Sequence, residues 1–211
     1  LLVSKAQEGK SVLRLKGGDP YVFGRGGEEA LFCRAAGIPF REVPGITSAI
    51  AVPAYAGIPV THRGIASSFA VITGHEDPEK TATSIHWPGL ATATDTLVFL
   101  MGMENLSYIG TQLIKHGKPA RTPVAVIRWG TKPEQTVLTG TLETIAQLVK
   151  EHNFQPPAVI VVGEVVKLRE QLRWFDNRPL HGKRIVVTRA RAQTSDLSGR
   201  LEEYGAECLQ C

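Results

Sequence analysis

Three short runs of aliphatic residues constrain the fold of this chain more than any other feature. They occupy residues 96–101, 124–128 and 158–162 and contain almost no polar side chains. An apolar run of this length is typical of a β-strand that is buried on both faces, which requires a covering layer on each side of the sheet. Helical patterns at about residues 104–116 and 142–152 lie between the runs. Strands that alternate with helices in this way predict an α/β fold.

The first seventy residues follow the same alternation. Residues 11–15 and 40–43 are rich in β-forming side chains and predict two strands, and residues 68–73 predict a third. Two helices are expected, one from Glu28 to Ala36 and one that starts at Thr47 or Ser48 and runs to Ala56. Both helices are followed by Gly-Ile-Pro, with glycine at the cap and proline beyond it, which is a common stop signal.

Changes in pattern predict three units, at 1–64, 65–177 and 180–211. The first boundary lies near Arg63-Gly64, and residues 75–94 are polar and contain proline, so we expect a surface excursion there. The last unit begins a strand near Arg184, continues with a helix over about residues 195–204 and then starts a further strand. Because the chain begins with Leu1 and this unit is unfinished, we expect the sequence to come from a longer protein.

Composition excludes several classes of protein. No run of 18 apolar residues is present and no signal peptide is recognisable, so neither a membrane span nor a membrane partner is expected. Three cysteines form no disulfide framework, which favours the cytoplasm. Cys208 and Cys211 are separated by two residues, but on a strand they point to opposite faces, so we predict no metal site. The net charge of +4 suits a polyanionic small molecule, nucleic acid, or a chance surplus of basic surface residues.

The segment Lys16-Gly17-Gly18-Asp19-Pro20 carries the strongest functional signal. It follows a predicted strand, where open α/β sheets bind ligands, and its glycines let a ligand approach the backbone closely. The spacing is not that of a dinucleotide-binding fingerprint, and no Gly-Lys-Ser/Thr follows as in a P-loop. The alternative is a tight loop that only reverses the chain.

Six blocks in order resemble the uroporphyrinogen-III C-methyltransferases of the tetrapyrrole methylase family. The resemblance extends over about residues 1–176, and each block is modest by itself, whereas their order is specific. The blocks are residues 12–29, 43–49 with 54–63, Thr73-Gly74-His75, 98–103, Gly130-Thr131 with Gln135, and 157–166.

This resemblance implies two α/β domains with S-adenosylmethionine in the cleft between them. It also implies a homodimer and no nucleic-acid partner. The implied cofactor contacts are Gly17, Gly18, Asp19, Val22, Thr47, Ser48, Met101, Gly130 and Ala158. For Met101, a core position at the end of a strand is the competing interpretation.

The implied reaction is C-methylation of uroporphyrinogen III to precorrin-2, for sirohaem or cobalamin. The substrate carries eight carboxylates, with which basic residues in the matched loops would pair. These residues are Arg14, Lys16, Arg25, Arg41, His62, Arg63 and Arg128. The family's expected base and its Gly-Pro-Gly-Asp turn would lie upstream of Leu1, so no catalytic residue is nominated.

The end of the chain adds a second resemblance. Residues 182–189 and 201–207 resemble the start of uroporphyrinogen-III synthase, which makes the methyltransferase's substrate, so we expect a fusion of consecutive enzymes. Three alternatives stay open. They are a methyltransferase that acts later on the corrin pathway, a ribosomal RNA methyltransferase of related fold, and a binding fragment that is inactive by itself.

Overall fold

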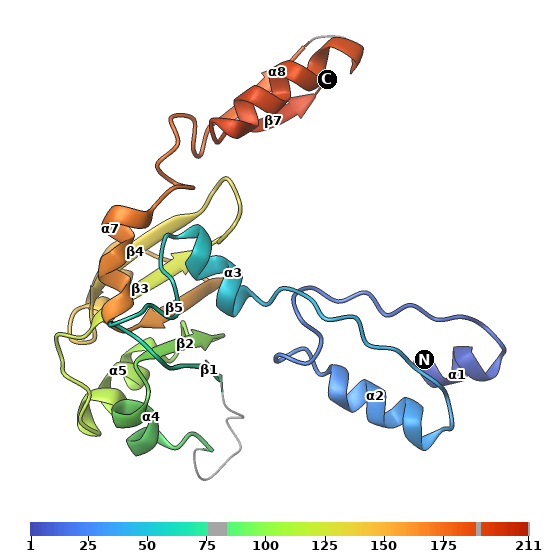
Figure 1. Ribbon diagram of the computed structural model, residues 1–211, viewed down its shortest axis with the longest axis horizontal. Helices are drawn as coiled ribbons and strands as arrows, with labels where there is room; N and C mark the ends of the chain where they lie inside the picture. Colours follow the sequence, from blue (N-terminus) through green and yellow to red (C-terminus); the bar gives the residue numbers. More distant parts are fainter. Residues whose placement is uncertain (76–83, 189–190, 211) are drawn as a thin grey trace. The chain divides into compact units, whose positions relative to one another are not determined.

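The computed structural model describes residues 1–75, 84–188 and 191–210 (Figure 1). The chain divides into two compact units, Leu1–Ser48 and Ala49–Cys211. The domain bounds 1–64, 65–177 and 180–211 remain predictions.

The first unit contains helices α1 (Leu2–Gln7) and α2 (Gly26–Ala35) and the first residue of α3 (Ser48–Tyr55). The strands predicted at 11–15 and 40–43 are wrong, because neither segment forms a strand. A β-ladder requires a neighbouring strand to share its backbone hydrogen bonds, and the described part of this unit provides none. β-Propensity alone therefore did not produce a sheet here.

Both predicted stop signals are confirmed. Gly37 after α2 and Gly57 after α3 adopt φ of +69° and +72°, in the left-handed region. In each case the glycine and the following isoleucine donate backbone hydrogen bonds into the last turn, as Ile38 does to the Cys33 carbonyl (2.9 Å). This is the Schellman pattern, which satisfies helix carbonyls that would otherwise lack partners.

The second unit is built on a mixed five-stranded sheet in the order β1-β2-β5-β3-β4. Neighbours β1 and β2 are parallel, whereas β5 runs antiparallel to β2 and β3, and β4 runs antiparallel to β3. The strands are β1 (Phe69–Thr73), β2 (Thr96–Leu100), β3 (Pro123–Arg128), β4 (Thr136–Thr141) and β5 (Ala158–Val162). Four of them were expected, and β4 was not.

The central strands are buried on both faces, as the sequence predicted. Alternate residues of β2, such as Leu97 and Phe99, pack in one core with helices α4 (Trp87–Ala93), α5 (Leu106–Lys115) and α6 (Ile145–Glu151). The intervening Val98 and Leu100 pack in a second core with α3. Figure 1 shows α4 and α5 on one side of the sheet and α3 on the other. The period-2 geometry of strands makes this division.

Helix α4 corrects the surface excursion predicted for residues 75–94. Trp87 is 3% exposed and stacks on Phe99 of β2, with the ring centroids 6.3 Å apart. Residues 84–94 therefore include buried structure, because an aromatic side chain anchors a segment whose remaining residues are mostly polar or small. Residues 76–83 of this prediction lie outside the described part of the chain.

The C-terminal part of the second unit begins with a 3-10 helix, η1 (Glu164–Leu168), and a short helix α7 (Arg169–Leu172). The predicted strand, helix and strand follow as β6 (Arg184–Val187), α8 (Arg191–Glu203) and β7 (Glu207–Gln210), and the two strands pair in parallel. Cys208 lies in β7, whereas Cys211 is outside the described residues. Across the described ranges, none of the helices has both the length and the apolar character that crossing a bilayer requires.

Gly57 should be much less tolerant of substitution than Gly117. Both adopt positive φ, but a Cβ on Gly57 would lie 2.5 Å from the Arg173 nitrogen, whereas one on Gly117 would lie 3.7 Å from the nearest atom. We expect Gly117→Ala to cost about 1 kcal/mol of stability from backbone strain. Gly57→Ala should cost a further ~1–3 kcal/mol from overpacking. Urea unfolding of the two variants checks this, and equal losses would contradict it.

Candidate functional site

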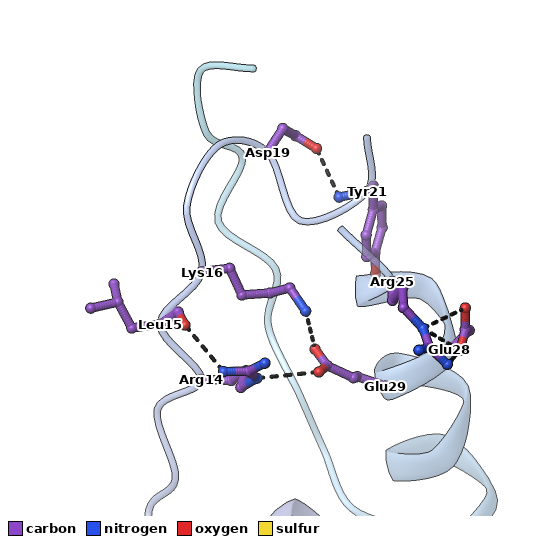
Figure 2. A network of polar contacts seen from close by, with 8 residues as sticks. All are labelled: Arg14, Leu15, Lys16, Asp19, Tyr21, Arg25, Glu28 and Glu29. Carbon is purple, nitrogen blue, oxygen red and sulfur yellow. Dashed lines mark hydrogen bonds and ion pairs between the residues drawn. The ribbon is translucent and has the colours of Figure 1, made fainter. Parts of the chain in front are cut away.

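Asp19 fixes the conformation of the glycine-rich loop in the first unit. Its Oδ1 accepts a hydrogen bond from the Tyr21 N–H at 2.8 Å, and its Oδ2 accepts one from the Gly45 N–H at 3.0 Å. Figure 2 shows the contact with Tyr21. The carboxylate therefore connects the loop to the turn at Pro44-Gly45, which lies 26 residues further along the chain. Asp19 has a structural role whatever the loop binds.

The glycines around Asp19 have two different roles. A Cβ on Gly45 would lie 2.0 Å from the Gly18 carbonyl oxygen, and one on Gly26 would lie 2.7 Å from the Pro20 carbonyl oxygen, so these glycines permit tight backbone packing. Gly18 has φ of +74°, and its Cβ would lie 4.0 Å from the Thr47 Cα. A Cβ on Gly17 would meet nothing within 4 Å. The backbone at Gly17 is therefore open to an incoming group.

Two carboxylates at the start of α2 hold the basic side chains of the loop. The Glu29 carboxylate pairs with Lys16 Nζ at 2.8 Å and with Arg14 Nε at 3.2 Å, and Glu28 pairs with Arg25 at 2.7 Å (Figure 2). The hydrogen bond from Lys16 lowers the pKa of Glu29, with a smaller contribution from Arg14. Arg25 likewise lowers the pKa of Glu28.

These ion pairs change the expectation for the loop cations. Arg14, Lys16 and Arg25 were expected to pair with substrate carboxylates, but the structure pairs each of them with α2. Lys16 is the most enclosed of the three, with a side chain 12% exposed. It immediately precedes Gly17, so its bond to Glu29 anchors the start of the glycine loop.

In the second unit, one edge of the sheet collects the other predicted residues. The carboxyl ends of β1, β2 and β3 and the amino end of β5 meet there, because β5 runs in the opposite direction. Met101 follows β2, Gly130 follows β3 by two residues, and Ala158 opens β5 opposite Arg128. Strand direction thus brings together residues that are up to 57 positions apart (158 − 101).

The backbone at this edge is strained. Met101, Trp129 and Thr131 adopt φ of 55°, 50° and 73°, values that residues other than glycine rarely adopt. Each such residue costs about 1–3 kcal/mol, and such strain is concentrated at binding and catalytic sites. Met101 is also 55% exposed, so its interpretation as a core residue is wrong. Its thioether is available at the edge of the sheet.

Gly130 has a packing role of its own. A Cβ on Gly130 would lie 2.4–2.8 Å from the side-chain atoms of Val52 on α3, so only glycine lets this turn approach the helix. The ends of β1 and β2 are equally close, because a Cβ on Gly74 would lie 2.3 Å from the Gly102 Cα. Asn105 Nδ2 donates to the Gly74 carbonyl at 2.7 Å and fixes this contact.

The structure therefore gathers the predicted residues in two groups, one in each unit. The first unit holds Gly17, Gly18, Asp19, Val22, Thr47 and Ser48, and the second holds Met101, Gly130 and Ala158. Val22 donates its N–H to the Asp19 carbonyl at 3.2 Å and so belongs to the loop turn. Within the described ranges, no group of three or more His, Cys, Asp or Glu side chains is arranged to hold a metal ion.

Sequence reasoning did not assign roles to Gln135, Asn105 or Glu29 as residues that fix the loops. Gln135 was part of a matched block, and Glu29 was read only as a favourable charge at a helix start. The one sequence signal for these three residues is that each lies close to a glycine turn along the chain. Thr131, one partner of Gln135, is only four residues away, but the other partners lie 13 to 80 residues away along the chain, so most of these contacts could not be predicted from sequence.

Comparison with known proteins places this geometry in a family. The signature of the tetrapyrrole (corrin/porphyrin) methylases matches residues 1–146. The chain is 57% identical over 172 residues, 82% of its length and 68% of the relative's, to the S-adenosyl-L-methionine-dependent uroporphyrinogen III methyltransferase of Methanosarcina barkeri. It is also 50% identical over 210 residues to the uroporphyrinogen-III C-methyltransferase of Bacillus subtilis. That alignment covers the whole of this chain and 43% of the relative.

Solved structures agree with this placement. The uroporphyrin-III C-methyltransferase of Thermus thermophilus in complex with S-adenosylhomocysteine matches with a TM-score of 0.67 and 35% identity, over 79% of this chain and 72% of that one. A cobalt precorrin-4 methyltransferase matches with a TM-score of 0.69 at 22% identity, over 78% and 68%, which shows the fold alone.

The fold and the sequence together define a methylase-type α/β protein, as the sequence predicted. The chain belongs to the tetrapyrrole methylase family.

The stability that Glu29 contributes through its ion pairs should depend on pH. Because its pKa is lowered in the folded state, Glu29 contributes stability above its unfolded pKa and loses it as pH falls through the folded pKa. We therefore expect Glu29→Gln to melt lower than wild type at pH 7 and to approach it near about pH 3. Thermal unfolding across this range tests the prediction. Glu104→Gln, at an exposed position, is the control. A melting-temperature difference between Glu29→Gln and wild type that stays constant with pH would contradict the prediction.

Proposed function

We propose that the protein binds S-adenosylmethionine and methylates uroporphyrinogen III on carbon, forming precorrin-2. The observation that carries this proposal is the 57% identity over 172 residues to an enzyme named for that cofactor and that substrate. The chain spans less than half of the Bacillus subtilis relative, so the activity of the whole protein is part of the proposal.

The residues present suit the methyl donor. In the first unit, the backbone at Gly17 is open. Gly18, the turn held by Asp19 and Val22, and the residues at the start of α3, Thr47 and Ser48, contribute further polar backbone groups. In the second unit, Met101 offers an exposed thioether at the same edge of the sheet as Gly130 and Ala158. Polar backbone groups suit the amino-acid and adenine parts of the ligand, and a polarisable sulfur suits its apolar parts.

When bound, S-adenosylmethionine supplies a sulfonium methyl group that is already electrophilic, and reduced pyrrole carbons are electron-rich. The protein therefore has to hold the two reactants in line at close range rather than activate a nucleophile. Rigid turns with a fixed backbone suit this task. A base must then remove the ring proton. No residue of this chain is assigned to that step, and we propose that a segment upstream of Leu1 provides it.

The substrate's carboxylates require cations that the protein does not already neutralise. Arg14, Lys16 and Arg25 are paired with α2. Arg128 differs, because its Nε is buried without a hydrogen-bond partner in the described structure, at the carboxyl end of β3. We therefore assign Arg128 to a substrate carboxylate. Arg41, His62 and Arg63 remain further candidates.

The wider context belongs to the same proposal. We propose a cytoplasmic homodimer in which residues 180–211 begin a uroporphyrinogen-III synthase-like domain. Two observations support the separate domain. The β6-α8-β7 unit forms a parallel pair of its own. The alignment with the Bacillus subtilis relative covers all of this chain, whereas the Methanosarcina barkeri alignment covers 82%.

Asp19→Ala should weaken cofactor binding severely. The substitution leaves the Tyr21 and Gly45 N–H groups without their acceptor, so the loop loses its fixed conformation. Hydrogen bonds to a charged group contribute about 1.5–3 kcal/mol each, which predicts at least a tenfold rise in the dissociation constant. Calorimetry with S-adenosylhomocysteine measures it. Asp196→Ala, at an exposed position of α8, is the control, and unchanged affinity of Asp19→Ala would remove the loop from the site.

The reaction itself is tested with the full-length protein. Incubation with S-adenosylmethionine and uroporphyrinogen III should give the absorbance of the oxidised dimethylated product. Methyl transfer to ribosomal RNA instead, with binding that weakens steeply as salt rises, would replace the proposal. Preference for a later, already methylated corrin precursor would shift the assignment within the family.

A further inference from the structure

Gln135 belongs to one of the matched blocks, but neither that match nor the cofactor assignment gives its side chain a role. It lies in the connection between β3 and β4, and it is only 2% exposed although its side chain is polar. Its Oε1 accepts a hydrogen bond from the Thr131 N–H at 2.9 Å, and its Nε2 donates to the Tyr55 carbonyl at 3.2 Å. The amide therefore uses its donor and its acceptor on two different segments of the second unit.

The first of these segments is the strained turn after β3. Thr131 is β-branched and has φ of 73°, and Trp129 has φ of 50°. Such a conformation persists only where the surroundings enforce it. The hydrogen bond from Thr131 to Gln135 supplies that constraint, one residue after Gly130.

The second segment is the C-terminus of α3. Tyr55 is the last residue of that helix, where backbone carbonyls have no partner within the helix. The same helix packs Val52 against Gly130, at a position where a Cβ would lie 2.4 Å away. Gln135 therefore connects the turn to the helix on which Gly130 rests, and two contacts hold the turn in place.

The backbone of Gln135 is itself fixed. Its N–H donates to the Lys132 carbonyl at 2.9 Å, and Lys132 in turn donates to the Trp129 carbonyl at 3.1 Å. His181 Nε2 lies 2.9 Å from the Gln135 carbonyl oxygen. The Gln135 side chain therefore extends from a fixed backbone, so its hydrogen bonds hold Thr131 and Tyr55 at defined positions.

We infer that Gln135 is a positioning residue that presets the Trp129-Gly130-Thr131 turn for the methyl donor. The inference rests on the proposed function, because it takes Gly130 as part of the cofactor site. Gln135 acts through the turn and is not assigned a contact with either reactant. Preorganisation of this kind raises affinity by removing the cost of ordering the turn on binding.

Two substitutions separate the hydrogen bonds from the bulk of the side chain. Gln135→Met keeps a similar volume but has neither the amide donor nor its oxygen acceptor. Gln135→Glu keeps the acceptor for Thr131, but its ionised form cannot donate to Tyr55. We expect Gln135→Met to weaken S-adenosylhomocysteine binding about tenfold, since each buried group left unpaired carries a desolvation penalty. The Thr131 amide resonance should also move upfield when its acceptor is lost.

The glutamate variant adds a pH signature. A protonated carboxyl group restores both hydrogen bonds, and burial raises the pKa of such a group. The affinity lost by Gln135→Glu at pH 7 should therefore recover as pH falls to about 5, relative to wild type at the same pH. A purely structural role would not predict this recovery of binding.

Ile145→Val is the control for general loss of stability. Ile145 is 1% exposed on α6 and contacts the core on the other face of the sheet, so this change should lower the melting temperature and leave affinity unchanged. If wild-type protein fails to bind S-adenosylhomocysteine, the proposed function is wrong and this inference is withdrawn with it. If wild type binds and Gln135→Met binds within twofold of it, the positioning role alone is overturned.

Discussion

The hydrogen-bonded ladder of β2, β5 and β3 is the constraint on which the rest of the second unit depends. These strands are apolar along almost their whole length, so they are stable only when both faces of the sheet are covered. Helices α4, α5 and α6 cover one face, and α3 covers the other. Because β5 runs against its neighbours, its first residue meets the ends of β2 and β3 at one edge. The packing that stabilises the second unit therefore also brings together its own group of candidate site residues.

Both groups of site residues rely on backbone geometry more than on reactive side chains. In the first unit, Asp19 accepts two backbone N–H groups and glycines let the segments pass within contact distance. In the second, Met101, Trp129 and Thr131 are held at positive φ. This suits transfer of a methyl group that is already activated, because such a reaction depends chiefly on placement. It also means that a lost side chain can reduce binding through loop order without having touched the ligand.

The charged side chains near the glycine loop also serve to hold the backbone in place. The three basic residues nearest the glycine loop are paired with α2, where the helix start also favours carboxylates. A surplus of positive charge in the sequence therefore does not by itself identify the residues that would contact a substrate. Arg128 is the better candidate, because its Nε is buried and unpaired within the described structure. Burial without a partner is costly, so it points to a ligand group that completes the site.

The sequence by itself determined the features that depend on local chemistry. The apolar runs identified the buried strands, Gly37 and Gly57 marked two helix ends, and six ordered blocks identified the family. Tertiary structure decided what depends on distant partners. Residues 11–15 and 40–43 had strand propensity but no strand to pair with among the described residues, and Trp87 became buried because Phe99 was there to receive it. The role of Gln135 likewise depends on its hydrogen bond to Tyr55, which is 80 residues away. Propensity acts within a few residues, whereas hydrogen-bond partners and burial are supplied by the whole fold.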